Sequence, residues 1–168
     1  MNILITGKPG IGKTTLIKDL ALKFAGKACG FYTEEIRKDG RRTGFRIKTL
    51  DARSGMLAGV DIQSPYRVGK YKVDLEDFER IVLPVIEGAL KDTRVIIIDE
   101  IGPMELYSRK FEELILKALD SPNSVIATIK QKSTPFTRAL KKRKDVAMYV
   151  LGHDNRKEVE EKILESLD

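Results

Sequence analysis

Short apolar runs alternate along the chain with longer segments in which apolar residues recur every three or four positions. The short runs predict β-strands and the periodic segments predict amphipathic helices, because side chains repeat with a period of about 2 in a strand and about 3.6 in a helix. The predicted strands are Ile3–Thr6, Ala28–Thr33, Arg94–Asp99, Ser124–Ile129 and Val146–Leu151. Strands that alternate with helices in this way are typical of an α/β fold, with a mostly parallel sheet flanked by helices.

Residues 31–73 break this alternation. Phe31–Lys38 and Thr43–Leu50 flank Asp39–Gly40, a dipeptide that favours a hairpin turn. We therefore expect a β-rich insertion at about residues 31–73, beside the parallel core of a single domain that spans residues 1–168. Such an insertion can serve as a lid, a dimer surface or a scaffold, and the sequence leaves these alternatives open.

The first predicted strand leads directly into a phosphate-binding loop. The loop matches the pattern G-x-x-x-x-G-K-[ST] and consists of Gly7, Lys8, Pro9, Gly10, Ile11, Gly12, Lys13 and Thr14. Its glycines allow successive backbone N–H groups to point at one anion, and the following helix adds positive potential at its start. Lys13 suits the β- and γ-phosphates, Thr14 suits Mg²⁺, and Thr15 either contacts the α-phosphate or caps the helix. The loop predicts binding of a nucleoside triphosphate with Mg²⁺.

A second nucleotide motif ends the third predicted strand. Val95, Ile96, Ile97 and Ile98 form an apolar run without alternation, and Asp99, Glu100, Ile101 and Gly102 follow it. Such a run predicts a central strand buried on both faces. We expect this strand to lie beside the strand of the phosphate loop, so that Asp99 holds Mg²⁺. Glu100 then points at the γ-phosphate, where a carboxylate can take a proton from water.

Two acidic residues close to Lys13 favour hydrolysis over simple binding, so Lys13, Asp99 and Glu100 are the predicted catalytic residues. We expect Glu105, a few positions further on, to start the next helix, where a carboxylate favours the helix dipole. A direct catalytic role for Glu105 is the less favoured interpretation.

Composition and charge bear on which partners, metal sites and locations the protein can have. The net charge is +6, but the basic clusters at 41–42 and 141–144 lack the interleaved aromatic residues of a nucleic-acid surface, which disfavours nucleic acid as the main partner. One cysteine, Cys29, and one histidine exclude an intrachain disulfide and argue against a structural zinc site. No apolar run approaches the length that spans a membrane, and we expect no leader before the first strand. We expect a cytoplasmic monomer.

With these motifs the chain resembles the small P-loop nucleoside-triphosphatases, the family of the human cancer-related nucleoside-triphosphatase and its archaeal and bacterial thermophile relatives. Beyond the loop, the stretches that carry the resemblance are 30–37, 40–45, 98–106, 143–145 and 155–156. The resemblance implies a RecA-like variant of the P-loop fold. It also implies slow, Mg²⁺-dependent hydrolysis of ATP, GTP, CTP and UTP to the diphosphate and phosphate. The family usually has lysine or another residue where Pro103 stands.

Phosphoryl transfer also needs positive charge at the transferring oxygens. The candidate arginines are Arg37, Arg41, Arg42, Arg138, Arg143 and Arg156. Arg156 follows the last predicted strand, where we suggest that it stacks on or clamps the base. Lys130 and Gln131 end the strand after the acidic pair and are candidate sensors of the γ-phosphate.

Two alternatives to a hydrolase stay open at this point. One is a P-loop kinase that moves the γ-phosphate to a small acceptor, with the basic segment 138–144 as a lid. The other is a nucleotide-regulated protein associated with RNA. A GTPase switch is disfavoured because no Asn-Lys-x-Asp sequence, which would read guanine, occurs in the chain.

Overall fold

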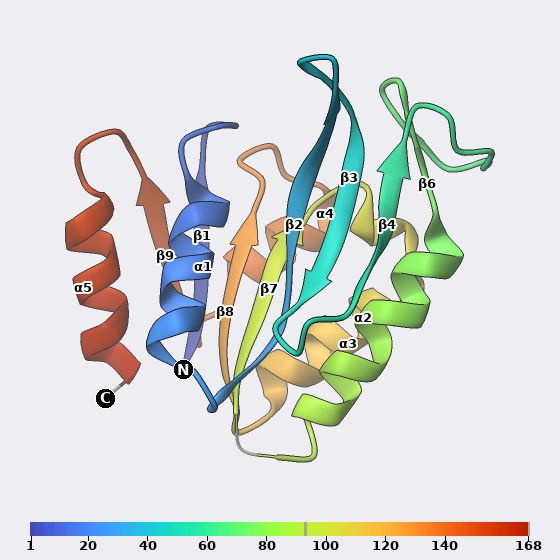
Figure 1. Cartoon of the computed structure of the whole chain (residues 1–168). Helices are drawn as coiled ribbons and strands as arrows, with labels where there is room; N and C mark the ends of the chain where they lie inside the picture. The colour runs from blue at the N-terminus through green and yellow to red at the C-terminus, as the bar shows by residue number, and fades with distance from the viewer. Residues whose placement is uncertain (93, 168) are drawn as a thin grey trace.

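The computed structural model describes residues 1–92 and 94–167, which form one nine-stranded sheet with helices on both faces (Figure 1). The strands are β1 (Asn2–Gly7), β2 (Ala28–Lys38), β3 (Arg41–Thr49), β4 (Ser54–Gly59), β5 (Arg67–Val68), β6 (Tyr71–Val73), β7 (Val95–Ile101), β8 (Ser124–Ile129) and β9 (Val146–Leu151). The helices are α1 (Lys13–Lys23), α2 (Leu75–Ala89), the short 3₁₀ helix η1 (Glu105–Tyr107), α3 (Arg109–Asp120), α4 (Pro135–Lys141) and α5 (Arg156–Leu167). No described helix combines the length and the apolar character needed to cross a membrane.

The parallel half of the sheet has the strand order β2-β7-β8-β1-β9. Our expectation that the acidic strand β7 lies beside β1 was wrong, because β8 lies between them and pairs in parallel with both. After β1 the chain passes through α1 to β2, which is not adjacent to β1 in the sheet. Strands β7 and β8, which come later in the chain, lie between them. The apolar residues of β8 are buried from Val125 to Ile129, so this strand is suited to the centre of the sheet.

The β-rich region continues the same sheet. Strand β2 pairs in parallel with β7 over Ala28–Phe31 and then in antiparallel fashion with β3 over Phe31–Lys38. Strands β4, β6 and β5 follow β3 outwards, all antiparallel. The predicted hairpin is present, and with β4, β6 and β5 it extends the central sheet beside its parallel half (Figure 1).

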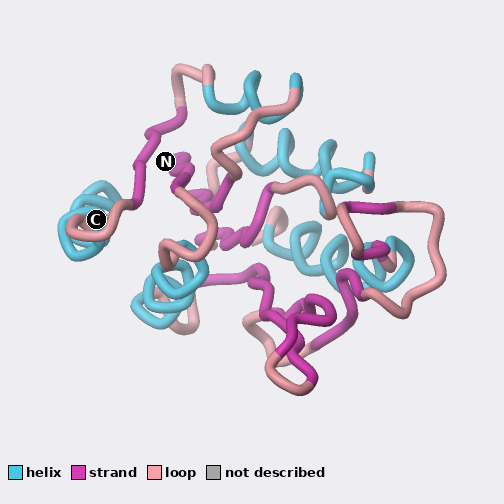
Figure 2. Tube along the Cα trace, turned by 90° about the horizontal axis from the view of Figure 1, so that it is seen from above, coloured by secondary structure: helices cyan, strands magenta, loops and turns pink. Residues whose placement is uncertain are grey.

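The helices cover the two faces unequally. Helices α1 and α5 pack with β1 residues such as Ile3 and Ile5 on one face, and α2 and α3 pack on the other face in a larger core (Figure 2). Phe31, Phe78 and Phe111 join β2, α2 and α3 in that core, with ring centroids 5.1–6.1 Å apart in edge-to-face contacts. The carboxyl ends of the parallel strands meet at one edge, where the phosphate loop follows β1.

Gly30 permits the close contact between β2 and β7. Its φ is +137°, and a methyl group placed on it would lie 1.9 Å from the Ile97 carbonyl oxygen. That atom belongs to the backbone of the central strand, so it cannot move aside without breaking the ladder. Gly30→Ala should therefore lower the free energy of unfolding by about 3 kcal/mol or more, measured by urea unfolding.

Gly88→Ala is the matched control for this substitution. Gly88 lies in α2, and a methyl group placed on it meets nothing within 4 Å. Alanine should stabilise the helix there by about 0.5–1 kcal/mol. A Gly30→Ala variant as stable as the Gly88→Ala variant would contradict the close packing of β2 against β7.

Candidate active site

The phosphate loop runs from the end of β1 at Gly7 to the first residue of α1 at Lys13. Gly12 precedes the helix with a left-handed φ of 106°, a conformation that a residue with a side chain adopts only under strain. This turn leaves the first N–H groups of α1 facing outward from the end of the helix, where they can bind an anion. The loop residues Gly7, Pro9, Gly10, Gly12, Lys13, Thr14 and Thr15 line one cleft.

Lys13 is held within this loop. Its Nζ donates hydrogen bonds to the carbonyl oxygens of Gly7, at 2.9 Å, and of Lys8, at 3.1 Å. Burial lowers the pKa of Lys13, while the nearby carboxylates of Glu100 and Asp99 oppose that shift. The predicted phosphate lysine and the predicted acidic pair are therefore close enough to influence one another's charge.

Asp99 lies at the end of β7 and is 1% exposed. Its Oδ2 accepts hydrogen bonds from Thr14 Oγ1 at 2.9 Å and from the Thr33 N–H at 3.3 Å, and its Oδ1 accepts one from Thr128 Oγ1 at 2.6 Å. Burial raises the pKa of Asp99, and the hydrogen bonds from these threonines act against that rise. The carboxylate is thus fixed in position by three other elements of the fold.

The contact between Thr14 and Asp99 joins the two residues predicted to bind Mg²⁺. Hydroxyl and carboxylate oxygens are ligands that Mg²⁺ accepts, so the donor set fits this ion. Among the described residues no three histidine, cysteine, aspartate or glutamate side chains form a metal site by themselves.

The residue patterns of the sequence did not identify Thr33 and Thr128. Thr128 is a fully buried polar residue in the otherwise apolar strand β8. Its hydroxyl reaches Asp99 only because β8 lies between β1 and β7, an arrangement that we had not expected. The sequence feature that could have pointed to Thr128 is a hydroxyl residue near the end of an otherwise apolar strand.

Glu100 follows Asp99 and lines the same cleft. Burial raises the pKa of Glu100, with Asp99 adding to the rise and Lys130 and Lys13 opposing it. Lys130 Nζ lies 3.9 Å from Glu100 Oε1. The arrangement places a carboxylate that can accept a proton beside the phosphate lysine and a second cation.

Glu105 begins the short helix η1, as its position predicted, but its side chain points inward. It is 3% exposed and lines the cleft near Glu100. Burial raises the pKa of Glu105 well above its usual value, and the charge of Glu100 adds to this rise. The expected position of Glu105 at the start of a helix is therefore confirmed, whereas the burial of its side chain in the cleft was not expected.

The cleft has a volume of about 1020 Å³ and is bounded on one side by the antiparallel half of the sheet. Its lining includes Glu34, Arg42 and Phe45 from the β2–β3 hairpin, and Tyr71 from β6. The insertion thus forms the wall that faces the phosphate loop.

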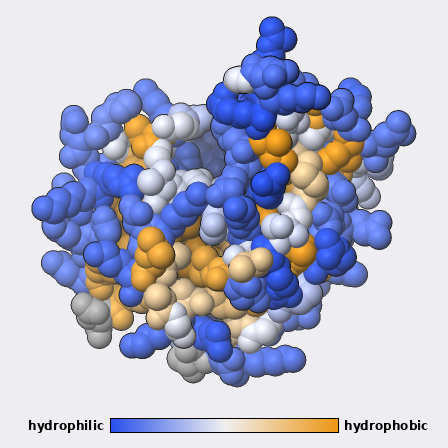
Figure 3. Space-filling model, viewed as in Figure 1, coloured by the Kyte–Doolittle hydropathy of each residue, from blue (hydrophilic) through white to orange (hydrophobic). Residues whose placement is uncertain are grey.

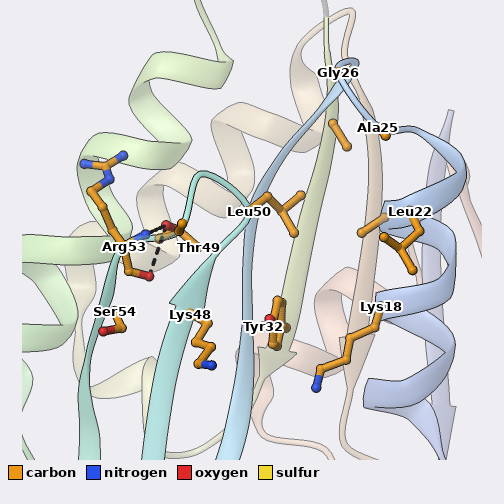
Figure 4. A pocket seen from close by; sticks show the side chains of 13 residues that line it. Lys18, Leu22, Ala25, Gly26, Tyr32, Lys48, Thr49, Leu50, Arg53 and Ser54 are labelled. Carbon is orange, nitrogen blue, oxygen red and sulfur yellow. Dashed lines mark hydrogen bonds between the residues drawn. The ribbon is translucent and has the colours of Figure 1, made fainter.

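A second hollow, of about 670 Å³, lies between α1 and the strands β2 and β3 (Figure 4). Apolar side chains gather on this face of the molecule, between α1 and the turn from β3 to β4 (Figure 3). Lys18 and Lys48 border the hollow, and both pair with Glu34, at 3.0 and 3.4 Å. The phosphate-loop residues, Asp99 and Glu100 line the cleft, so the chemistry is assigned to the cleft.

The arginine candidates are mostly held in ion pairs. Arg143 binds Asp120 and Asp145 at the start of β9, the end of that strand opposite the phosphate loop. Arg42 reaches the cleft, but its guanidinium group binds Glu35 at 3.1 Å and the Tyr71 hydroxyl at 2.8 Å.

Arg156 lies against the phosphate loop, outside the lining of the cleft. Its Nη1 would be 3.5 Å from a methyl group on Gly12, and its Nη2 pairs with Asp19. The structure thus brings Arg156 close to the loop and leaves its suggested contact with a base as a prediction.

The chain is similar in sequence to known nucleoside-triphosphatases. A family model described as NTPase matches residues 2–164. A nucleoside-triphosphatase THEP1 from Thermotoga sp. (strain RQ2) is 53% identical, over 99% of this chain and 95% of its own length.

Two solved structures share the fold. The crystal structure of THEP1 from the hyperthermophile Aquifex aeolicus has a TM-score of 0.92 at 38% identity and covers 100% of this chain and 99% of its own. The solution structure of a human cancer-related nucleoside triphosphatase has a TM-score of 0.84 at 37% identity, with 99% and 97% covered. On these matches of sequence and fold, with the phosphate loop and the acidic pair in one cleft, the chain belongs to the NTPase family of THEP1 and the cancer-related nucleoside-triphosphatase.

Proposed function

We propose that this protein hydrolyses nucleoside triphosphates to the diphosphate and inorganic phosphate, with Mg²⁺ as cofactor. The observation that carries the proposal is the 2.9 Å contact between Thr14 of the phosphate loop and Asp99 of the acidic pair, with Glu100 in the same cleft. The names of the family relatives describe nucleoside-triphosphatases, which supports the same chemistry.

The loop would bind and orient the phosphates. Lys13 and the N-terminal N–H groups of α1 supply positive charge, and Thr14 and Asp99 supply the oxygen ligands for the metal. When bound, Mg²⁺ neutralises charge on the β- and γ-phosphates. The three threonine hydrogen bonds to Asp99 keep this ligand in place before the substrate arrives.

Glu100 would act as the base. It takes a proton from a water molecule while the water oxygen forms a bond to the γ-phosphorus. The bond from that phosphorus to the oxygen of the β-phosphate breaks, and the nucleoside diphosphate leaves with the electron pair. The positive charges of Lys130 and Lys13 favour the ionised form of Glu100 that this step requires.

We expect slow turnover because the arginines nearest the phosphate loop and the cleft are paired with acidic side chains. In related phosphoryl-transfer enzymes an inserted arginine increases the rate by about 10³–10⁵-fold. In the described part of the chain, Arg42, Arg143 and Arg156 are each engaged by acidic side chains. Lys13 and Lys130 act on the charge of Glu100, and Lys132 also lines the cleft.

Broad base specificity is supported by the loop after β9, where P-loop proteins often hold the base. The amide group of Asn155 is engaged within this loop, with the Gly152 N–H at 2.7 Å and the Val150 carbonyl at 2.9 Å. A side chain whose hydrogen-bonding groups are already used within the loop is poorly suited to hydrogen-bond with the edge of a base. We therefore expect ATP, GTP, CTP and UTP to be hydrolysed at similar rates.

Glu100→Gln tests the role of the base. Glutamine keeps the size of the side chain but cannot take up the proton, so kcat should fall by about 10²–10⁴-fold while nucleotide affinity changes little. Steady-state phosphate release from the four nucleotides and equilibrium binding would measure the two quantities. Equal losses of binding and turnover would mean that Glu100 holds the metal or the structure instead.

Thr128→Val tests whether the hydrogen bond from Thr128 helps Asp99 to act as a metal ligand. The substitution removes the hydrogen bond to Asp99 Oδ1, so protons compete better with Mg²⁺ for the carboxylate. The Mg²⁺ concentration for half-maximal hydrolysis should rise by about 10–100-fold, and most at low pH. A Mg²⁺ titration of the initial rate at several pH values would measure it.

Thr6→Val is the control for that experiment. Thr6 also carries a buried hydroxyl, on the neighbouring strand β1, and this hydroxyl has no hydrogen-bond partner among the described residues. Its removal should leave the Mg²⁺ requirement as it is. Similar shifts in both variants would show that Thr128 acts through packing and not through Asp99.

The size of the cleft favours a second candidate function, transfer of the γ-phosphate to an acceptor. Beyond the phosphate loop the cleft extends to Phe45, Leu57, Val68 and Tyr71, where a small molecule could be accommodated. A kinase reaction would place label from γ-labelled ATP in a nucleoside monophosphate when adenosine, guanosine, cytidine or uridine is added. For a hydrolase we expect all of the label in inorganic phosphate.

A further inference from the structure

The segment between β8 and α4 contributes three polar residues to the cleft. Lys130, Gln131 and Lys132 follow the end of β8 and line the cleft together with the phosphate loop and the acidic pair. All three residues are exposed. A short exposed connection of this kind is more mobile than the elements it joins unless other contacts hold it. The place of its side chains in the cleft therefore depends on what fixes residues 130–133.

A single ammonium group holds this segment. Lys141 Nζ donates hydrogen bonds to the carbonyl oxygens of Lys130, at 2.5 Å, and Gln131, at 3.0 Å. It donates a third hydrogen bond to Ser133 Oγ, also at 3.0 Å. Because a lysine ammonium group has three N–H donors, these three acceptors use all of them. Lys141 is half-buried, whereas its neighbour Lys142 is exposed.

Helix α4 anchors Lys141 in the fold. Leu140 is buried in the larger core, and Phe136 packs against that core. At the start of the helix Thr134 and Thr137 form a capping box, in which each side chain accepts a hydrogen bond from the backbone N–H of the other residue. Side chains of a helix lean towards its N-terminus, so Lys141, at the last position of α4, reaches back to the segment that precedes the helix.

The segment places one cation beside the proposed base. Lys130 Nζ lies 3.9 Å from Glu100 Oε1. An exposed ion pair at this distance holds a long side chain only weakly, so the place of Lys130 depends on its backbone, which Lys141 binds. Under the proposed function the γ-phosphate lies next to Glu100, where a cation stabilises the charge of the transferring oxygens.

We propose that Lys141 is a positioning residue for hydrolysis: its ammonium group holds the backbone of Lys130, so that the Lys130 side chain stays beside Glu100 and binds the γ-phosphate. The inference rests on the proposed function, in which Glu100 is the base. It adds a residue that acts on the reaction only through Lys130. A displacement of about 1 Å near the reacting groups can lower a rate by about 10²-fold, so the loss of such support is measurable.

Lys141→Met and its matched control Lys142→Met test this support. Methionine keeps a long, flexible side chain but removes the charge and the three donors. In Lys141→Met kcat for ATP should fall by about 10–100-fold, whereas Lys142→Met, which loses the same charge, should keep the wild-type rate. Equal rates in the two variants would overturn the proposal. Thermal unfolding would show that both variants fold, and Lys141→Gln would replace the methionine variant if it does not.

Nucleotide binding distinguishes positioning from a general loss of structure. ADP lacks the γ-phosphate that Lys130 is proposed to bind. Lys141→Met should therefore lower the affinity for β,γ-imido-ATP by about 10-fold and leave the affinity for ADP unchanged, as measured by equilibrium binding with Mg²⁺. Equal losses for both nucleotides, or a loss for neither, would overturn the positioning role.

The Lys130→Met background tests the route through Lys130. If Lys141 acts only by holding Lys130, Lys141→Met should cause no further loss of turnover or of β,γ-imido-ATP affinity in that background. A further loss as large as in the wild type would overturn this route.

Two of these measurements do not depend on hydrolysis. A wild-type protein that releases no phosphate would overturn the proposed function, yet β,γ-imido-ATP binding would still test Lys141. Limited trypsin digestion tests the support without any nucleotide. Cleavage after Lys130 and Lys132 should be about 10-fold faster in Lys141→Met than in Lys142→Met, because hydrogen bonds from a charged group no longer oppose local opening. Equal cleavage rates would show that Lys141 does not hold the segment.

Discussion

The site depends on one buried carboxylate and the threonines that hold it. Asp99 receives hydrogen bonds from Thr14 at the start of α1, Thr33 in β2 and Thr128 in β8. An ionised carboxylate that is 1% exposed is stable only with such partners, since burial alone would drive it to the neutral form. The phosphate loop, the hairpin strand and the central strand β8 are therefore brought together at a single side chain.

Much of the site could be predicted because its chemistry is concentrated in two short stretches. Glycine spacing identifies the phosphate loop, and an apolar run that ends in Asp99 and Glu100 identifies the acidic pair. Strand order could not be predicted, because local residue patterns determine the type of an element but not its neighbours in space. Thr128 escaped notice for the same reason, since its contact with Asp99 joins two strands that are distant along the chain.

Much of the positive charge of this basic chain is paired with acidic side chains. The net charge is +6, yet Arg42, Arg143 and Arg156 are bound to acidic side chains, and Lys18 and Lys48 share Glu34. Paired surface charges stabilise a fold only slightly, but they hold long side chains in defined places. The composition therefore said little about the active site, whose electrostatics depend on Lys13, Lys130 and the buried acids.

Strand β2 belongs to both halves of the sheet, and this has a mechanical consequence. An outward movement of the hairpin would bend β2 near Phe31, where its pairing changes from β7 to β3. The Thr33 N–H bond to Asp99 lies just beyond that point, on the moving side. Any force that pulls the hairpin outward would thus loosen a support of the Asp99 carboxylate at the same moment, so a wider cleft and a less firmly held Asp99 would occur as one event.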